Sequence, residues 1–413
     1  SRRRYLSTSQ AQSWPQSPVR GSESKLPHPA AAGTGVAKTV LSSRGDAPKR
    51  GCAPSCIGGC RKSHDEAIDP KKRNLSTAKS LEDPGGDRPE TVYGSIFDMF
   101  PHGKKRCSVT SAPSDALQKG FSDKKTEKVG DLPEKASDLR IGYACKKGLK
   151  PESPNQDDFC IYCTDELGIF GVFDGHGPYG HDVSGFVHGC LPHSFVLDSW
   201  FREKPEQAMR AAFPKTLQLC QETANDGRFD CTLSGTTASL MMYRDDTVYI
   251  AHVGDSRVVL ARDNTNKLKS EDLTQDHKPD DPSEMRRIET AGGQVRRMEG
   301  DIPSRVFLAG KMYPGLTMTR SIGDTIGAKA GVTSMPDISS HKVQRDWRFM
   351  LMCSDGVWEF FTSQEAVDFV GRFPPHEVQK ASEALAAEAW NRWIQEEGNI
   401  ADDITVVCIW LPS

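Results

Sequence analysis

The stretch Gly168-Ile169-Phe170-Gly171-Val172-Phe173-Asp174-Gly175-His176-Gly177 is an apolar run that ends abruptly in an aspartate, a histidine and glycines. Its apolar part has the length of a β-strand, and such continuous hydrophobicity is typical of a strand covered on both faces. Because glycine lets the backbone turn sharply, the carboxylate of Asp174 is predicted at a turn that directly follows the strand. The stretch therefore predicts a buried sheet with polar groups at its edge.

The same arrangement recurs far along the chain, at His252-Val253-Gly254-Asp255-Ser256-Arg257 and at Leu351-Met352-Cys353-Ser354-Asp355-Gly356. Acidic pairs also precede two further apolar runs, at Asp157-Asp158 and at Asp402-Asp403. An ordinary turn is the alternative interpretation of each instance taken alone, because Asp-Gly is a common turn sequence. Because the pattern recurs at widely separated positions in the sequence, it favours a shared function for these aspartates.

Carboxylates that meet at one sheet edge repel one another, and burying them is costly unless a cation neutralises them. Mg²⁺ and Mn²⁺ bind carboxylate and carbonyl oxygens together with water. The cysteines and histidines, by contrast, are not spaced for zinc. The pattern therefore favours an oxygen-rich site for two Mg²⁺ or Mn²⁺ ions.

The element pattern from residue 138 onward predicts an α+β fold. Short β-rich apolar runs predict strands at 141–145, 159–164, 168–173, 237–243, 247–253, 258–261, 349–353 and 404–411. Apolar residues at helical spacing predict helices around 183–191, 205–224, 285–288, 364–370 and 377–395. Strands and helices grouped in this way indicate two packed sheets with helices outside.

Residues 1–135 are predicted to be a basic, low-complexity, disordered extension, and 136–413 the folded domain. The extension is rich in Ser, Pro, Gly, Lys and Arg and lacks apolar periodicity, so it cannot bury enough surface to offset the entropy cost of ordering. Residues 1–130 have a net charge of +10 and the remainder −13. A basic tail could contact anionic partners, and a solvated tail is the plainer alternative.

Three cysteines of this extension, Cys52, Cys56 and Cys60, could bind metal or accept lipid, although chance cysteines in a linker explain them as well. The basic clusters 71–73 and 104–106 could be nuclear localisation signals. No signal peptide or bilayer-spanning run is visible in the sequence. The chain is therefore expected inside the cell, in the cytoplasm or nucleus, with membrane anchoring through the extension left open.

Six motifs, in this order, resemble the signature motifs of the type 2C metal-dependent serine/threonine protein phosphatases. They are Val172-Phe173-Asp174-Gly175-His176-Gly177, Ser234-Gly235-Thr236-Thr237-Ala238, Val253-Gly254-Asp255-Ser256-Arg257, Thr319-Arg320-Ser321-Ile322-Gly323-Asp324, Ser354-Asp355-Gly356-Val357-Trp358 and Asp402-Asp403-Ile404-Thr405-Val406-Val407. The resemblance covers about 138–412. It implies a four-layer fold, in which a sandwich of two antiparallel sheets is flanked by helices.

The resemblance also implies a set of ion ligands. Asp174 would bridge two Mg²⁺ or Mn²⁺ ions, and the carbonyl of Gly175 would bind one of them. Asp355 and Asp402 would complete the other, while Asp157 would hold a water bound to metal. These roles match the oxygen-rich site that the strand ends predict.

A weaker third-ion site is implied at Asp255 together with Asp355, and Glu359 is a further candidate for it. His176 would be the general acid for the leaving oxygen. A hydrogen bond to backbone is the alternative role for a histidine between two glycines. An imidazole titrates near neutral pH, which suits proton donation.

The implied reaction is hydrolysis of phosphoserine or phosphothreonine by in-line attack of a hydroxide that bridges the two ions. Two ions lower the pKa of a shared water and neutralise the phosphoryl oxygens. Such a reaction needs no covalent enzyme intermediate, so serines and cysteines near the site need no nucleophilic role. Phosphoprotein substrates are the expected partners, and a monomer is expected.

Two positions depart from the family pattern. Gln156 stands where many members have an acidic residue, which predicts weaker or water-mediated binding of the second ion. Lys147 or Lys150 is predicted to bind substrate phosphate where many members place an arginine, with a plain solvated turn as the alternative.

These departures keep a second hypothesis open, a pseudophosphatase that uses the same fold for binding or regulation. The retained carboxylates and His176 oppose it, because a scaffold has no physical need for clustered carboxylates. A nucleic-acid-associated role through the basic extension ranks last, since the sequence lacks aromatic interleaving and a recognised binding motif.

Overall fold

Two antiparallel sheets stacked face to face form the centre of the computed structural model, which describes residues 103–111, 126–132, 134–149, 153–265, 267–298 and 303–411. The first sheet has the order β15-β8-β7-β5-β4-β1-β2, and short strands β6 and β14 extend it at the end of β5. Its strands are β1 (Lys105–Thr110), β2 (Thr126–Val129), β4 (Asp157–Thr164), β5 (Leu167–His176), β6 (Gly235–Thr236), β7 (Ala238–Arg244), β8 (Thr247–Val253), β14 (Ile322–Gly323) and β15 (Asp337–Lys342).

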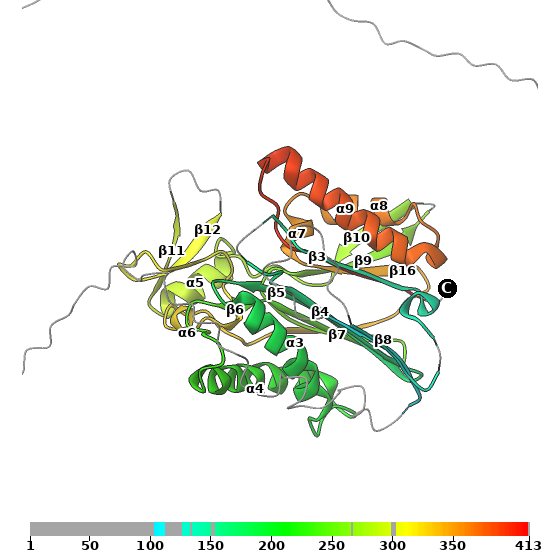
Figure 1. The fold of residues 1–413 in the computed structure, drawn as a ribbon, viewed down its shortest axis with the longest axis horizontal. Coiled ribbons are helices and arrows are strands. Elements are labelled where there is room, and N and C mark those ends of the chain that lie inside the picture. Colours follow the sequence, from blue (N-terminus) through cyan, green and yellow to red (C-terminus); the bar gives the residue numbers. More distant parts are fainter. Residues whose placement is uncertain are drawn as a thin grey trace, which may run out of the picture. The chain divides into compact units, whose positions relative to one another are not determined.

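The second sheet has the order β10-β9-β16-β17-β3. Its strands are β3 (Ile141–Lys146), β9 (Arg257–Asn264), β10 (Lys267–Asp272), β16 (Trp347–Cys353) and β17 (Ile404–Trp410). Every pairing within it is antiparallel. In Figure 1 the two sheets lie one above the other, with helices on both outer sides.

Strand alternation explains how β4 is buried on both faces. Phe159 and Ile161 point into the core between the sheets, whereas Cys160 and Tyr162 point to the opposite face, beneath the helices. Successive side chains of a strand point to opposite faces, so a continuous apolar run is what a doubly covered strand requires. The interpretation of the run in β5 as a buried strand is confirmed on the same ground.

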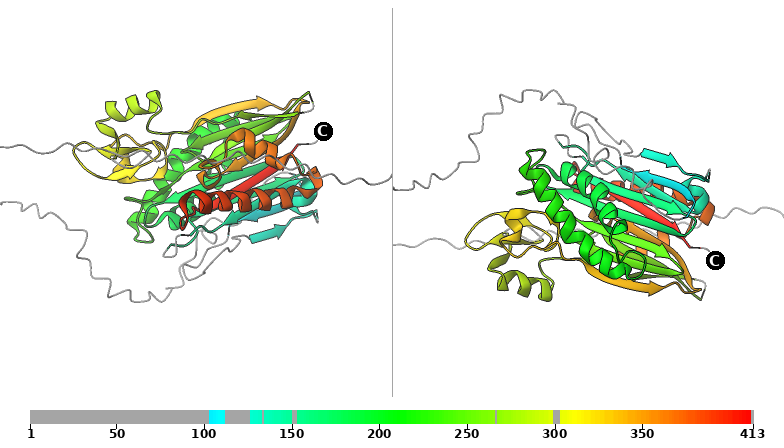
Figure 2. Two further views of the ribbon diagram at one scale, coloured as in Figure 1. Left: turned by 90° about the horizontal axis from the view of Figure 1, so that it is seen from above. Right: turned by 90° about the horizontal axis from the view of Figure 1, so that it is seen from below.

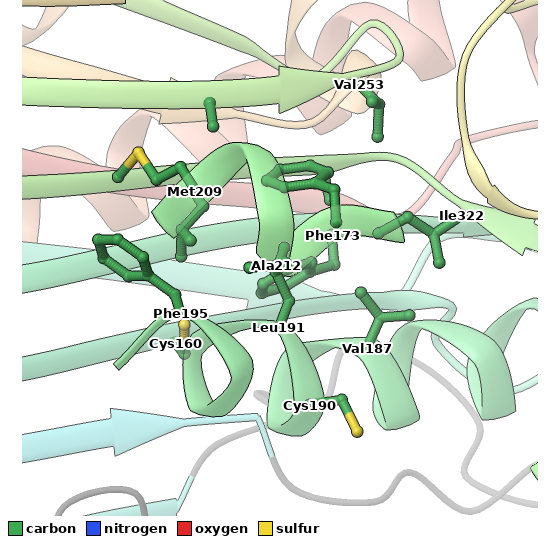
Figure 3. Packing of buried hydrophobic residues seen from close by; sticks show 14 of the residues in the cluster. Cys160, Phe173, Val187, Cys190, Leu191, Phe195, Met209, Ala212, Val253 and Ile322 are labelled. Atoms are coloured by element: carbon green, nitrogen blue, oxygen red, sulfur yellow. The ribbon is translucent and has the colours of Figure 1, made fainter. Parts of the chain in front are cut away.

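Helices α3 (Gly180–Val196) and α4 (Pro205–Asn225) cover the outer face of the first sheet. Figure 3 shows Val187, Leu191 and Phe195 of α3 in one buried cluster with Phe173 of β5 and with Met209 and Ala212 of α4. Each of these side chains is fully or almost fully buried. Full burial of a side chain of this size contributes about 1.5–3 kcal/mol, so this layer fixes the loop that precedes α3.

The outer face of the second sheet is covered by α8 (Ser363–Val370) and α9 (Val378–Glu397), after the short helix α7 (Asp355–Trp358). The left view of Figure 2 shows α9 lying across this sheet. The α+β fold of two antiparallel sheets between helices, in four layers, is confirmed. The predicted strands and helices all appear, the helices close to their predicted bounds.

The described fold begins earlier in the chain than the predicted domain start at 136. Strand β1 pairs with β4 and buries Cys107 and Val109 in the core between the sheets. The boundary at 136 therefore cuts off two strands of the first sheet. The run Lys105–Thr110 holds too few apolar residues to stand out from the basic, low-complexity sequence around it.

A smaller subdomain, which we call the flap, projects beside the sandwich (Figures 1 and 2). It consists of α5 (Pro282–Thr290), α6 (Thr325–Ala328) and a sheet of β11 (Gly293–Arg297), β12 (Ser304–Leu308) and β13 (Pro314–Leu316). Short 3-10 helices occur at Ala136–Leu139 and Pro375–Glu377. Among the described residues, no helix has both the length and the apolar character needed to cross a bilayer. Cys52, Cys56, Cys60 and the basic cluster 71–73 lie outside the described residues.

Candidate active site

The register of the strands brings five aspartates from distant parts of the sequence to one end of the sandwich. Asp157 of β4 and Asp174 of β5 are direct cross-strand partners. In the second sheet, Cys353 at the end of β16 pairs with both Arg257 and Val406. The residues just beyond these pairs, Asp355, Asp255 and Asp402, therefore emerge at the same edge.

The electrostatics show that these carboxylates lie close enough to repel one another. Burial and the charges of Asp402 and Asp255 raise the pKa of Asp355 to about 7. Burial also raises the pKa of Asp174, and the charges of Asp355, Asp157, Asp402 and Asp255 raise it further. The edge is therefore a concentration of negative charge, which a bound cation would stabilise.

Exposure divides the five aspartates into two groups. Asp157 and Asp255 are buried, whereas Asp174, Asp355 and Asp402 remain partly exposed. Asp174, Asp355 and Asp402 are therefore the members of the group that solvent reaches.

Two hydroxyl groups hold Asp157 in place. Ser354 Oγ and Thr405 Oγ1 donate to Asp157 Oδ2 at 2.7 and 2.8 Å. Burial and the neighbouring charge of Asp403 raise the pKa of Asp157, and the two hydroxyls oppose that rise. Ser354 and Thr405 come from the ends of β16 and β17, so these hydrogen bonds tie the two sheets together at the site.

Asp403 fixes the backbone of two loops. Its carboxylate accepts hydrogen bonds from the backbone N–H of Gly148 at 2.6 Å and of Gln156 at 2.8 Å. A side chain on Gly148 would lie 2.3 Å from the carbonyl oxygen of Ala401, so only glycine fits there. The loop before β4 is thereby held against the loop before β17.

Gln156 contributes to the histidine loop through its amide nitrogen. Its Nε2 donates to the carbonyl oxygen of Gly177 at 2.8 Å, and its backbone carbonyl accepts from Gly175 N at 3.1 Å. Gly177 has a φ of +85°, a left-handed conformation that glycine adopts without steric cost. Gln156 thus shapes the turn that carries His176.

His176 is paired with Asp324, from the start of the flap helix α6. Its Nε2 lies 2.7 Å from Asp324 Oδ2, which also accepts a hydrogen bond from Ser321 Oγ at 2.5 Å. Burial alone would lower the pKa of His176, but the carboxylate of Asp324 reverses this and raises it. A side chain on Gly235 would lie 2.2 Å from Asp324 Oδ2 and 2.9 Å from His176 Nε2, so glycine is needed for the pair to meet.

Asp255 already has a cation beside it. Lys278 Nζ forms an ion pair with Asp255 Oδ2, and the charge of Asp255 raises the pKa of Lys278 although burial opposes it. The other oxygen, Asp255 Oδ1, is buried and has no hydrogen-bond partner among the described residues. Arg257, two residues after Asp255, forms a two-point ion pair with Asp276 at 2.9 and 2.7 Å. This ion pair anchors the segment that carries Asp255.

The two lysines predicted to bind phosphate are placed differently. Lys147 is buried, and its Nζ donates to the Gly148 carbonyl oxygen at 3.5 Å. Lys150 lies outside the described residues. Glu359, the further candidate for a third-ion site, is exposed just after α7. In the described part of the chain, no three His, Cys, Asp or Glu side chains form a ready-made metal-binding group.

Several residues that complete the site were not predicted from the sequence to do so. They are Asp324, which pairs with His176, Lys278, which pairs with Asp255, and Ser354, Thr405 and Asp403, which hold the carboxylates and loops. Most lie inside or next to the recurring motifs. Their position in or beside the motifs was therefore the signal available in the sequence. The partners of these residues are apparent only from the fold.

Comparison with known proteins gives a consistent result. The family model described as Protein phosphatase 2C matches residues 151–398. "Probable protein phosphatase 2C 35" of Arabidopsis thaliana is 33% identical over 304 residues, which cover 67% of this chain and 85% of that protein. "Probable protein phosphatase 2C 64" of Oryza sativa subsp. japonica is 36% identical over 270 residues, 62% of each chain.

Among solved structures, the serine-threonine phosphatase 2C from Toxoplasma gondii has a similar fold, with a TM-score of 0.60. The two are 19% identical, and the match covers 74% of this chain and 99% of that one. The fold, the six ordered motifs, the family model over more than half of the sequence and the curated relatives all agree. The chain belongs to the protein phosphatase 2C family.

Proposed function

We propose that this protein is a metal-dependent protein phosphatase that hydrolyses phosphoserine and phosphothreonine in protein substrates. The observation that carries the proposal is the convergence of Asp157, Asp174, Asp255, Asp355 and Asp402 at one edge of the sandwich, which follows from the register of the strands and is reflected in the raised pKa of Asp174. Membership of a family whose curated relatives are named as probable protein phosphatases supports it.

The chemistry of the donor atoms at this edge suits divalent cations, although no three carboxylates of the described residues are already arranged as a ligand set. Carboxylates that raise each other's pKa are stabilised by a nearby positive charge, and the donors are all oxygen atoms, as Mg²⁺ and Mn²⁺ prefer. The buried, unpartnered Oδ1 of Asp255 points to the same need. A side chain on Gly175 would lie 2.6 Å from the Gln156 carbonyl oxygen, so the backbone there can approach its surroundings as closely as only glycine permits.

We propose the same ligands that the family resemblance implies. Asp174 and the Gly175 carbonyl would hold one ion, and Asp174, Asp355 and Asp402 the other. Asp157 would hold water near them from its position between Ser354 and Thr405. When bound, two such ions would neutralise the phosphoryl oxygens and lower the pKa of a nearby water, the chemistry that in-line attack on phosphorus requires.

A third ion at Asp255 would have to share it with Lys278. That lysine already neutralises one oxygen of the carboxylate, which makes this the weaker position. The amide of Gln156 is turned toward Gly177. We therefore propose that Gln156 contributes by shaping the histidine loop, and that it is not an ion ligand.

Proton transfer to the leaving oxygen is assigned to His176. Loss of the phosphoryl group leaves a serine or threonine alkoxide, which is a poor leaving group unless it is protonated. The carboxylate of Asp324, 2.7 Å from His176 Nε2, favours the protonated imidazole and fixes the ring. Asp324 itself is held by Ser321, so it acts as the positioning residue for His176.

Release of inorganic phosphate from a phosphothreonine peptide tests the proposal. The wild-type protein should release phosphate when Mn²⁺ or Mg²⁺ is present and stop when the ions are chelated. Asp174→Asn keeps the size of the side chain and removes its charge, so it should be nearly inactive. Equal rates for the two proteins, or a rate unchanged by chelation, would refute the catalytic assignment.

A further inference from the structure

Two large apolar side chains are exposed beside the histidine loop. Tyr179 is 44% exposed and Leu233 is 42% exposed. Single exposed apolar residues are common on protein surfaces and need no explanation. These two differ because they come from adjoining segments, both of which are fixed to the candidate active site.

Hydrogen bonds and close contacts join the two segments. The backbone N–H of Tyr179 donates to Ser234 Oγ at 2.9 Å. A side chain on Gly177 would lie 2.2 Å from the carbonyl oxygen of Leu233, so the two backbones touch. The exposed side chains of Tyr179 and Leu233 are therefore carried by two backbone segments in direct contact.

Backbone hydrogen bonds hold both segments in place. Tyr179 precedes the first turn of α3, and its carbonyl oxygen accepts from Val183 N at 3.0 Å. On the other segment, the Ser234 carbonyl oxygen accepts from Asp324 N at 2.9 Å. An apolar side chain on a fixed backbone loses little conformational freedom when a ligand covers it, which favours binding.

The position relative to the chemistry identifies the occupant. Tyr179 is three residues after His176, and Leu233 is two residues before Gly235, which pairs with His176 across β5 and β6. His176 faces the oxygen of the phosphorylated residue in the proposed function. Residues that neighbour the phosphorylated one in a bound substrate would therefore lie near the segments that carry Tyr179 and Leu233.

We infer that Tyr179 and Leu233 form an apolar subsite for a hydrophobic side chain one or two positions from the phosphorylated residue of the substrate. The inference rests on the proposed function and narrows its substrate class. Phosphothreonine sequences with a flanking leucine or similar residue are preferred over those with flanking polar residues. The preference appears mainly in kcat/KM, since the contact lies outside the reacting group.

Paired phosphothreonine peptides test the inference. The two peptides of each pair differ by leucine or serine at one position, from two residues before to two after the phosphothreonine. For the wild-type protein with Mn²⁺, kcat/KM should be about tenfold higher for leucine at one or more of these positions. The ratio within each variant is the readout, so a general loss of activity cancels.

Tyr179→Ser and Leu233→Ser should bring this ratio close to one, and Tyr179→Phe should keep it, because the ring remains. Leu197→Ser is the matched control. Leu197 is also exposed but lies after the far end of α3, about 25 Å along a 17-residue helix, and its loss should leave the ratio unchanged.

A wild-type ratio near one at every position, or a ratio that survives both serine variants, overturns the subsite. A small aryl phosphate separates this failure from a failure of the proposed function. Activity on the aryl phosphate without peptide preference refutes the subsite alone. A protein inactive on the aryl phosphate and on all peptides refutes the phosphatase assignment, and the subsite with it.

Discussion

Asp324 Oδ2 lies 2.7 Å from His176 Nε2, and the two residues are 148 positions apart in the sequence. The contact joins the loop after β5 to the start of the flap helix α6. It explains why a histidine in a turn has a raised pKa although it is largely buried. In the proposed mechanism the contact makes the flap part of the catalytic apparatus, since the start of α6 supplies the carboxylate that would orient the proton donor.

Asp324→Asn should lower the rate on phosphothreonine peptides roughly ten- to a hundredfold, because the imidazole loses the charge that favours its protonated form. An aryl phosphate has a leaving group that needs little protonation, so its hydrolysis should fall much less. Steady-state kinetics with both substrates check this. Equal losses on the two substrates would contradict a role through proton donation, and Ser321→Ala serves as a control that keeps the carboxylate.

Lys278→Met should destabilise the fold by about 1–3 kcal/mol, because it leaves the buried carboxylate of Asp255 without its cation. This destabilisation is smaller than the one expected for a fully buried ion pair, because the Lys278 side chain is partly exposed. Added Mn²⁺ should restore stability more strongly in the variant than in the wild type, as an ion replaces the lost charge. Thermal unfolding with and without Mn²⁺ measures both effects.

The exposed pair of Lys380 with Glu377 gives the matched control. Lys380→Met should change the unfolding temperature little, with or without Mn²⁺. A Lys278→Met protein as stable as the wild type, or one with no added response to Mn²⁺, would contradict the account of Asp255.

Gln156→Glu should destabilise the protein by about 1–3 kcal/mol, although it restores the residue type common in the family. The new carboxylate would face the Gly177 carbonyl oxygen, which now accepts a hydrogen bond from Gln156 Nε2. Its phosphatase activity should fall as the histidine loop loosens. Higher stability together with tighter Mn²⁺ binding would show that position 156 serves the ions instead.

Acid sensitivity is expected at His252, which stacks on His277 with ring centroids 4.5 Å apart. Burial, and then the neighbouring His277, lower the pKa of His252 to about 4. Because the unfolded chain binds a proton near pH 6.5, this histidine favours unfolding as the pH falls from about 6.5 toward 4. The expected loss in the free energy of unfolding is about 3 kcal/mol over that window.

Denaturant unfolding at several pH values tests this prediction. His252→Gln should be less stable at pH 7, because the side-chain hydrogen bond to the Gln275 carbonyl oxygen is disturbed. It should nevertheless lose less stability than the wild type on going from pH 6.5 to 4. Parallel pH profiles for the two proteins would show that His252 is not responsible.

The sequence predicted the layers of the fold well, because its strong signals are those of buried strands. The runs in β4, β5, β16 and β17 are continuously apolar, as doubly covered strands must be. The aspartates were found for the same reason, since each follows directly after such a run. Strand β1 was missed because its pattern is weak and its burial depends on pairing with β4.

Contacts between distant side chains could not be predicted in this way. Nothing in the local sequence of Asp324 indicates a partner 148 residues away, and nothing near Lys278 indicates that it neutralises Asp255. The local sequence is equally compatible with a Gln156 amide that faces an ion and with one that faces the backbone. Such choices are decided by the register of β4 with β5 and by the position of the flap.

Ion binding gives the most direct measurement of the central claim that the converging aspartates hold a pair of divalent cations. Equilibrium dialysis against Mn²⁺ should find at least two ions per wild-type chain, and fewer in Asp174→Asn, whose missing charge lies between the proposed sites. The count does not depend on finding a substrate. Equal numbers of bound Mn²⁺ in the two proteins, or none in the wild type, would contradict the account.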